Sequence, residues 1–311
     1  MPRMPRKISI ALFCFWLFIP LHSFAKELIP MGHSIGVQLQ MPFVFVSHDV
    51  LLSSGEWLKQ GERISKVNDK ALTDINTLTS FDNSVKLTIE HAGNTRVVKV
   101  SQDQLTHIKP FLKSETDGIG TLTFIDPETM EYGALGHQIV DSVLKQPPNF
   151  TQGAIYEADI SQVKKSVPGQ PGYKVSIVDR TLKPLGTVIS NDVYGIFGHW
   201  EQALQPSLPQ PLEMIQKEQL KKGKAQLLTT VDGGDVQSFS IEIKETDGSY
   251  FTFHVTDERL IAKTGGIIQG MSGSPIIQDN RFVGAVTHMF VEEPTKGAGI
   301  LVVEMLKKSP N

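Results

Sequence analysis

The chain is poor in cysteine. Its 311 residues contain a single one, Cys14, which lies close to the N-terminus. The body of the protein after this residue therefore has no disulfide, no thiol nucleophile and no cysteine metal site. Any covalent catalysis in that body has to use an oxygen or nitrogen nucleophile.

The chain also lacks an excess of charge of one sign. Lys and Arg number 30 and Asp and Glu number 33, giving a formal net charge of -3. Binding to nucleic acid normally needs a clustered basic face, so no nucleic-acid partner is expected. The nine histidines show no H-E-x-x-H spacing, and neither a P-loop nor G-x-G-x-x-G occurs. We therefore expect no metal and no cofactor.

No apolar run reaches the roughly 20 residues that a membrane-spanning helix needs, but the N-terminus comes close. Basic residues at positions 3, 6 and 7 precede an apolar run, and Ser23-Phe24-Ala25 follows it. This order is typical of a secretory signal. Residues 1–25 are therefore predicted to be a cleavable signal peptide or an uncleaved membrane anchor. Both place the body across the cytoplasmic membrane; cytoplasmic retention is the remaining alternative.

The rest of the chain is predicted to be mainly β. Residues 30–104 contain alternating strands, one short helix at 72–78 and a hairpin at Gly93-Asn94, which together indicate a small domain. Residues 105–117 are the predicted linker. Residues 118–311 contain many short strands with Gly, Pro and Asp turns, which favour a barrel or sandwich, with a helix expected at 212–222.

The densest chemical signal is the Gly-rich stretch from Gly265 to Pro275. Ser272 stands in Gly270-Met-Ser-Gly273, where glycine allows backbone conformations with positive φ. Such a backbone can point consecutive N–H groups at one place, as an oxyanion hole requires. Ser272 is therefore a candidate nucleophile. A Gly/Ser turn without chemistry is the alternative.

A second signal ends at His137, in Tyr-Gly-Ala-Leu-Gly-His. Histidine is the usual general base for a serine nucleophile. His199 and His288 are rival candidates, and His288 could lie near Ser272 because it follows the serine motif by one strand. A histidine with a purely structural role is the alternative.

A third candidate is a carboxylate that would orient the histidine. Asp257 follows a strand and precedes a short helical stretch, so it could be the N-cap of that helix, the triad member or both. Asp141 and Asp192 are weaker candidates.

Two long stretches together resemble the stage IV sporulation protein B (SpoIVB) peptidases. One runs from Gly118-Ile-Gly-Thr-Leu-Thr to the histidine motif, and the other from Thr264-Gly-Gly through Met-Ser-Gly-Ser-Pro to Thr287-His-Met-Phe. The resemblance implies a small PDZ domain (β with a short helix) followed by a chymotrypsin-like β-barrel serine peptidase. It assigns the triad to Ser272, His137 and Asp257. By the same analogy, the backbone N–H groups of Gly270 and Ser272 form the oxyanion hole.

The resemblance also implies a biological role. Members of the family act between the mother-cell and forespore membranes, where they cleave a membrane-bound regulatory protein and so activate sigma-factor processing. They also tend to cleave themselves. By position, peptide-binding residues of the PDZ groove are expected at Ser34, Ile35, Gly36 and Val37, which would bind a peptide or the protein's own chain. The stretch between Val46 and Gly61 is short for a PDZ domain.

Two other functions compete with an exported serine endopeptidase. One is a secreted PDZ-containing binding protein with an inactive peptidase domain. The other is a serine hydrolase that acts on a non-peptide ester or amide. The presence of all three candidate triad residues favours a peptidase over the binding protein.

Overall fold

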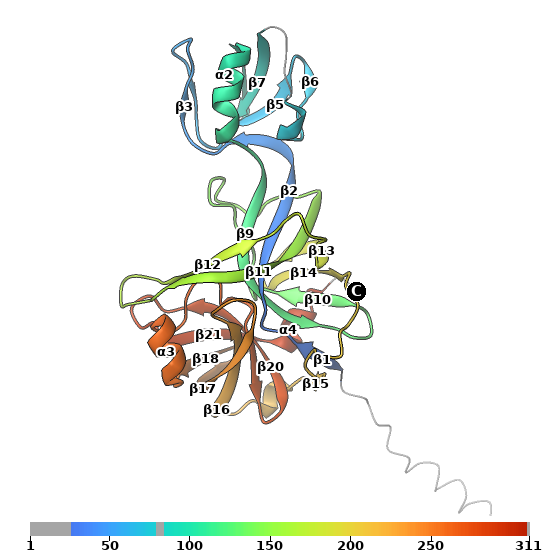
Figure 1. Ribbon diagram of the computed structural model, residues 1–311, viewed down its shortest axis with the longest axis vertical. Helices are drawn as coiled ribbons and strands as arrows, with labels where there is room; N and C mark the ends of the chain where they lie inside the picture. The colour runs from blue at the N-terminus through green and yellow to red at the C-terminus, as the bar shows by residue number, and fades with distance from the viewer. Residues whose placement is uncertain (1–25, 79–83, 310–311) are drawn as a thin grey trace, which may run out of the picture.

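The computed structural model describes residues 26–78 and 84–309, and these fold mainly as β-strands (Figure 1). The predicted signal or anchor segment lies outside the described residues. Among the helices of the described part, none is long and apolar enough to cross a membrane.

Six antiparallel strands form a first closed ring. The sheet closes on itself because β2 pairs with β11 along one edge and with β9 along the other. In ring order the strands are β2 (Ser34–Val46), β9 (Leu112–Ile125), β10 (Glu131–Ala134), β14 (Gly195–Trp200), β13 (Gly186–Asp192) and β11 (Gln152–Lys164). Apolar side chains that alternate along these strands, such as Ile35, Leu122 and Ile155, fill the interior.

A second closed barrel follows in the chain. Its strands in order are β16 (Gly223–Thr230), β17 (Val236–Asp247), β18 (Tyr250–Val255), β21 (Lys296–Leu301), β20 (Arg281–Met289) and β19 (Pro275–Gln278). Phe239, Phe251 and Phe253 are at most 2% exposed and form the centre of its core. Two short helices, α3 (Glu258–Thr264) and α4 (Val302–Leu306), lie on this half.

A separate apolar cluster joins the two barrels. Phe124 and Phe197 from the first barrel pack with Phe282 and Ile300 from the second, all fully buried. The rings of Phe124 and Phe282 meet edge to face with their centroids 6.4 Å apart. The short strands β1 (Glu27–Pro30) and β15 (Leu212–Glu213) extend the first sheet past this seam. The barrels therefore form one body with a continuous interface.

The small domain stands above this body and is joined to it by β2 and β9 (Figure 1). The far halves of both strands enter its sheet, since Val44 pairs with Ile64 and Val46 with Leu112. The other elements are β3 (Val50–Leu51), β4 (Trp57–Leu58), β5 (Arg63–Val67), β6 (Lys70–Ala71), η1 (Ile75–Thr77), β7 (Val85–His91), β8 (Asn94–Val100), α2 (Gln102–Ile108) and η2 (Lys109–Phe111). This domain has its own apolar core.

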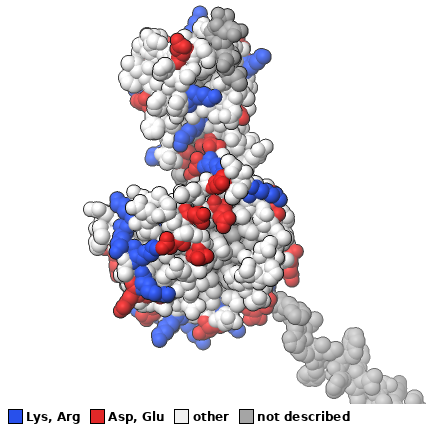
Figure 2. All heavy atoms as spheres, in the orientation of Figure 1, with Lys and Arg blue, Asp and Glu red and all other residues white. Residues whose placement is uncertain are grey.

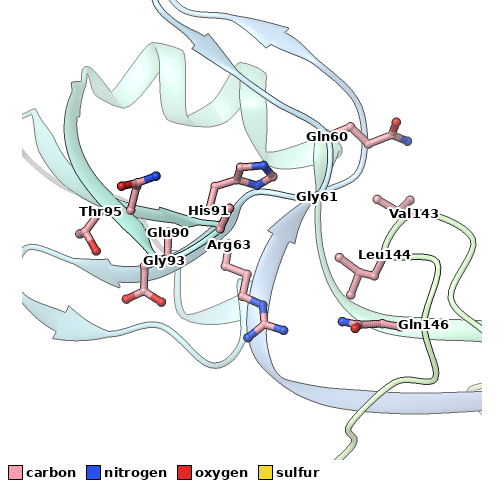
Figure 3. A pocket seen from close by; sticks show the side chains of 12 residues that line it. Gln60, Gly61, Arg63, Glu90, His91, Gly93, Thr95, Val143, Leu144 and Gln146 are labelled. Carbon is pink, nitrogen blue, oxygen red and sulfur yellow. The ribbon is translucent and has the colours of Figure 1, made fainter.

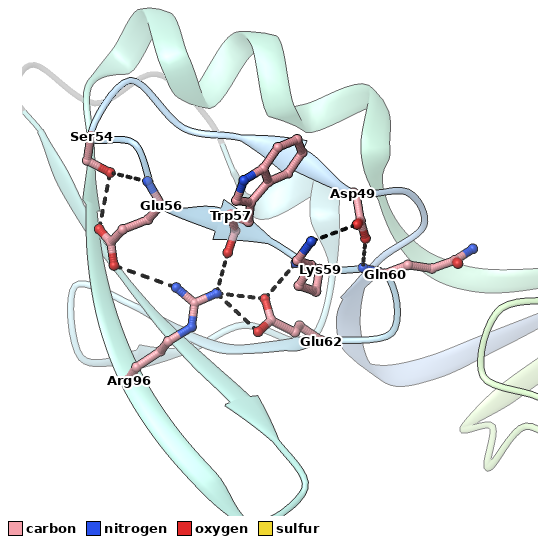
Figure 4. Close-up of polar contacts among 8 residues, drawn as sticks. All are labelled: Asp49, Ser54, Glu56, Trp57, Lys59, Gln60, Glu62 and Arg96. Carbon is pink, nitrogen blue, oxygen red and sulfur yellow. Dashed lines mark hydrogen bonds and ion pairs between the residues drawn. The ribbon is translucent and has the colours of Figure 1, made fainter.

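Ion pairs hold the short stretch between Val46 and Gly61 in the small domain (Figure 4). The Arg96 guanidinium donates to the backbone oxygen of Trp57 at 2.6 Å and to the Glu62 carboxylate at 2.8 Å. Lys59 pairs with Asp49 at 3.0 Å. Glu62 is almost fully buried, and its ion pair with Arg96 offsets the cost of burying its carboxylate.

The expected domain boundaries differ from the structure. Residues 34–40 pair inside the first barrel, although they were expected in the small domain. The predicted linker, residues 105–117, consists of the end of α2, η2 and the first residues of β9. The small domain is therefore an insertion between two neighbouring barrel strands, and its two connections are the strands themselves.

The helix expected at 212–222 is also absent. Leu212 pairs with Leu28 in a strand, and the N–H of Ile215 donates to the Phe282 oxygen at 2.8 Å. Only the 3₁₀ turn η3 (Lys217–Gln219) is helical in this segment. Pairing across the barrel seam has overridden the local helical spacing.

The surface carries charges of both signs on the face drawn in Figure 2. The small domain also forms a cavity of about 540 Å³ against the loop at residues 143–146 of the body. In Figure 3, Gln60, Arg63 and His91 lie on one side of it, with Leu144 and Gln146 on the other. None of the candidate catalytic residues lines this cavity.

Candidate active site at the barrel seam

The loop that carries Ser272, residues 269–274, lies just before β19 in the second barrel and is called the serine loop. Gly270 and Gly273, on either side of Ser272, have φ angles of +94° and +93°. A Cβ atom on Gly273 would come within 2.2 Å of the Thr121 oxygen and 2.5 Å of the Leu135 nitrogen. Only glycine fits there, so the glycines of the motif are explained by backbone conformation and by close approach of the two barrels.

Strand β9 of the first barrel holds this loop through backbone and hydroxyl groups. The Thr121 hydroxyl donates to the Gly270 oxygen at 2.8 Å, and the Thr121 N–H donates to the Ser272 oxygen at 2.9 Å. The Thr123 hydroxyl donates to the Gly273 oxygen at 2.8 Å. Sequence reasoning missed both threonines; their signal was the alternation of Thr121 and Thr123 on one side of a buried strand.

With its carbonyls fixed in this way, the loop leaves two N–H groups free. Within the described residues, neither the N–H of Gly270 nor that of Ser272 has a hydrogen-bond acceptor. N–H donors that have no acceptor in the free enzyme can stabilise a developing oxyanion with little reorganisation. The loop thus has the groups that the predicted oxyanion hole requires.

His137 follows β10 at the end of a strained turn. Leu135 and Gly136 have φ angles of +71° and +69°, and a Cβ on Gly136 would lie 2.9 Å from the Val286 oxygen. The His137 Nδ1 atom lies 2.9 Å from the Gln138 carbonyl oxygen. Because a carbonyl can only accept, Nδ1 carries the proton of the neutral ring. The other ring nitrogen, Nε2, is then free to accept one.

Asn191 fixes the segment that orients His137. Its side-chain oxygen accepts from the Ile139 N–H at 2.8 Å, and its amide donates back to the Ile139 oxygen at 2.9 Å. The Gln138 side-chain amide also donates to the backbone oxygen of Asn191 at 3.2 Å. No pattern in the sequence pointed to Asn191, because its partners are some 52 residues away.

The structure brings Ser272 and His137 to one cleft of about 390 Å³ at the seam between the barrels. His288 also lines it, together with apolar side chains that include Ile119, Pro171 and Val291. The Ser272 hydroxyl donates to the Thr287 oxygen at 3.2 Å, and the described structure has no hydrogen bond between Ser272 and His137. Catalytic hydrogen bonds are often formed only when substrate binds. A proton transfer between the two side chains would require this hydroxyl to turn from Thr287 toward the imidazole.

The rival histidines lie in different places. His288 is close to the site, with its ring centroid 5.8 Å from that of His137. Burial, and then the neighbouring His137, lower the pKa of His288 below its ordinary value, so it favours the neutral form. His199 is exposed on β14 and does not line the cleft.

Asp257 caps a helix and does not contact His137. Its carboxylate accepts from the backbone N–H groups of Arg259, Leu260 and Ser240, and it forms an ion pair with Arg259 at 2.9 Å. These interactions, led by Arg259, lower the Asp257 pKa from 3.8 to about 2. The sequence expectation of an N-cap is confirmed. The expected triad contact is not formed, because the carboxylate is already bound at the start of α3.

The weaker acidic candidates also lie outside the cleft. Asp141 accepts from the Thr116 hydroxyl at 2.6 Å and from two backbone N–H groups of its own turn. Asp192 lies at the end of β13, 4.0 Å from the Lys308 ammonium. In this structure the group that orients His137 is a backbone carbonyl, not a carboxylate.

The expected peptide-binding residues are not available to a peptide, and that prediction is wrong. Ser34, Ile35, Gly36 and Val37 lie in β2 inside the first barrel and are buried. On one side they pair with β9 and on the other with β11. A strand that is paired on both edges cannot accept another strand.

Within residues 26–78 and 84–309, no group of three or more His, Cys, Asp or Glu side chains is arranged to hold a metal ion.

Two antiparallel six-stranded barrels with a serine, a histidine and free N–H donors at their seam define a serine peptidase domain of the double-barrel class. Residues 104–306 match the model of the SpoIVB peptidase S55 family. The chain therefore belongs to this family, and the resemblance noted in the sequence is confirmed. A comparison with curated proteins found no match.

Solved structures with similarity to the chain are those of the Rv3671c protease. The inactive form has 17% sequence identity and a TM-score of 0.36, and the match covers 61% of this chain and 82% of that one. The active form, from M. tuberculosis, has 17% identity and a TM-score of 0.37, with 62% and 73% covered.

Proposed function

We propose that the chain is an exported serine endopeptidase in which Ser272 is the nucleophile and His137 is the general base. The observation that supports this most strongly is the serine loop, which places Ser272 beside two N–H groups without acceptors and in one cleft with His137. In the proposed reaction His137 takes the proton of Ser272 as its oxygen attacks a peptide carbonyl. The N–H groups of Gly270 and Ser272 bind the resulting oxyanion. Water then releases the acyl group.

The proposed substrate is a membrane-bound regulatory protein whose cleavage activates sigma-factor processing, and the enzyme also cleaves itself. Membership of the SpoIVB peptidase family supports this role. The proposed place of action is the space between the mother-cell and forespore membranes, with residues 1–25 directing export or anchoring the chain.

The small domain is proposed to act as a PDZ-like peptide-binding module. Its ligand has to use an edge other than residues 34–37. Strand β8 ends the sheet order and pairs only with β7 among the described strands. Its outer edge is therefore the place at which a peptide, or a segment of the protein's own chain, would add as a strand.

The experiment compares the purified body, residues 26–311, with its Ser272→Ala, His137→Ala and His288→Ala variants. A fluorophosphonate probe labels activated serines, and mass spectrometry follows chain length. We expect labelling and self-cleavage in the parent and none with Ser272→Ala. His137→Ala should lose at least about 10³-fold in labelling rate, while His288→Ala loses far less.

Three outcomes contradict the proposal. Labelling of Ser272→Ala at the parent rate would show that another residue is the nucleophile. A larger loss in His288→Ala than in His137→Ala would exchange the roles of the two histidines. A well-folded parent that is neither labelled nor cleaved would favour the binding protein with an inactive peptidase domain.

A further inference from the structure

A buried lysine lies directly beneath the serine loop and has no acidic partner. Lys174, in β12 (Tyr173–Val178), is only 6% exposed. Its Nζ atom donates to the Ser34 hydroxyl at 3.1 Å and to the Thr229 hydroxyl at 3.2 Å. No carboxylate among the described residues forms an ion pair with it. Buried ammonium groups are normally paired with a carboxylate, so this arrangement is unusual.

Lys174 contacts the serine loop through both its backbone and its side-chain carbons. Its backbone N–H donates to the Gln269 oxygen at 3.1 Å. Its side-chain carbons lie beside Gly270, where an added Cβ would come within 3.1 Å of the Lys174 Cδ atom. The loop therefore rests on this side chain, and the glycine at 270 allows the contact.

A chain of hydroxyl groups leads from the ammonium group of Lys174 to the serine loop. The Ser274 hydroxyl donates to Thr229 at 2.9 Å and lies 3.4 Å from the Thr121 hydroxyl. Thr121 in turn donates to the Gly270 oxygen. All three hydroxyl-bearing residues are fully buried. In such a water-poor interior, charges act over a longer range than at the surface.

We propose that Lys174 is a positioning residue of the oxyanion hole, whose buried ammonium supports the serine loop and stabilises the negative charge that develops there during acyl transfer. The inference rests on the proposed function of Ser272. The physical reason is complementarity in charge: the ammonium faces only hydroxyls while the site is empty, and it gains an anion nearby when the tetrahedral intermediate forms.

The titration of Lys174 supplies a direct readout. Burial lowers its pKa from 10.5 to about 7, within an accessible range. Titratable groups on the adjoining elements include His33 next to Ser34, Tyr173 in the same strand, and Glu157, Asp159 and Lys164 in β11, where Lys164 pairs with Tyr173. None of these is a hydrogen-bond or ion-pair partner of the Lys174 ammonium, which donates to Ser34 and Thr229.

The first test places a fixed charge at the site without using catalysis. Ser272→Asp introduces a carboxylate, and Ser272→Asn is its neutral match. The Lys174 titration is followed by NMR of protein with isotope-labelled lysine and assigned by its absence in Lys174→Met. We expect the midpoint to be higher in Ser272→Asp than in Ser272→Asn by about one pH unit. Equal midpoints would overturn the proposal.

The second test measures the rate at which fluorophosphonate labels Ser272. Lys174→Met keeps most of the length of the side chain and removes its charge, and Lys164→Met is the control at an exposed lysine. We expect labelling to slow roughly tenfold in Lys174→Met and to stay unchanged in the control. Parent-like labelling in a folded Lys174→Met protein would also overturn the proposal.

The two tests separate the two proposals. If Lys174→Met does not fold, the Lys174 signal is identified as the lysine resonance that titrates near pH 7 rather than near 10.5, and the charged and neutral variants at position 272 still decide. If the probe does not label the parent, the peptidase proposal fails, whereas the titration shift still shows whether Lys174 senses charge at the serine loop.

Discussion

At the scale of single residues, the hydrogen bonds of Asp257 decide between two roles, the N-cap of a helix and the carboxylate that orients His137. Its folded-state pKa of about 2 lies below the ordinary 3.8, so the ionised carboxylate stabilises the fold above pH 4. This contribution is lost as the pH falls toward 2. We expect Asp257→Ala to lower the free energy of unfolding by about 1 kcal/mol at pH 7. Urea denaturation should show this difference shrinking at pH 3.

Activity gives the other half of this prediction. Asp257→Asn keeps much of the cap, and fluorophosphonate should label Ser272 in it within a few-fold of the parent rate. A loss of about 10⁴ would instead show that Asp257 orients His137 in the working enzyme.

The sequence predicted the backbone conformation and the helix cap of single residues well where these are local. The positive φ angles of Gly270 and Gly273 and the cap at Asp257 are properties of the local backbone, so they could be inferred from a short stretch. Asn191, Thr121 and Lys174 act on residues more than 50 positions away, and only the closure of the barrels brings them there.

At the scale of elements, β9 connects the two halves of the site. The buried Thr123 hydroxyl satisfies the Gly273 oxygen. Thr123→Val, which keeps the shape, should therefore leave a buried carbonyl unpaired, lower stability by about 1–3 kcal/mol and slow the labelling of Ser272. Thermal unfolding and labelling rates check this, with Thr95→Val at an exposed position of β8 as control. Equal effects in both variants would contradict a specific role for the β9 hydroxyl.

Prediction of elements from sequence succeeded where alternation was strong. The many short strands expected within residues 118–311 and the Gly93-Asn94 hairpin are present. Prediction failed at 212–222, because pairing with β1 and with Phe282 decided the conformation there.

At the scale of the whole molecule, the first barrel needs strands from both sides of the inserted domain. We therefore expect residues 118–311 alone not to fold, since they lack β2, whose Ile35 and Leu39 are fully buried. Gln40 pairs with Glu115. A protein with residues 26–40 joined to 115–311 by an Asn-Gly turn should fold and be labelled at Ser272.

Circular dichroism and thermal unfolding compare the two truncated proteins. A cooperatively folded 118–311 fragment, or a disordered hairpin-joined protein, would contradict the insertion topology. The boundary was not visible in the sequence because β2 and β9 each run through both domains as one uninterrupted strand.

This continuity has a mechanical consequence. Strand β9 begins in the small domain at Leu112 and reaches the serine loop at Thr121 without an intervening turn. Tilting the small domain therefore has to bend or twist a strand that holds the Ser272 loop, and the irregular pairing between Gln40 and Phe45 is where such bending can concentrate. The small domain is therefore coupled mechanically to the Ser272 loop through one continuous strand.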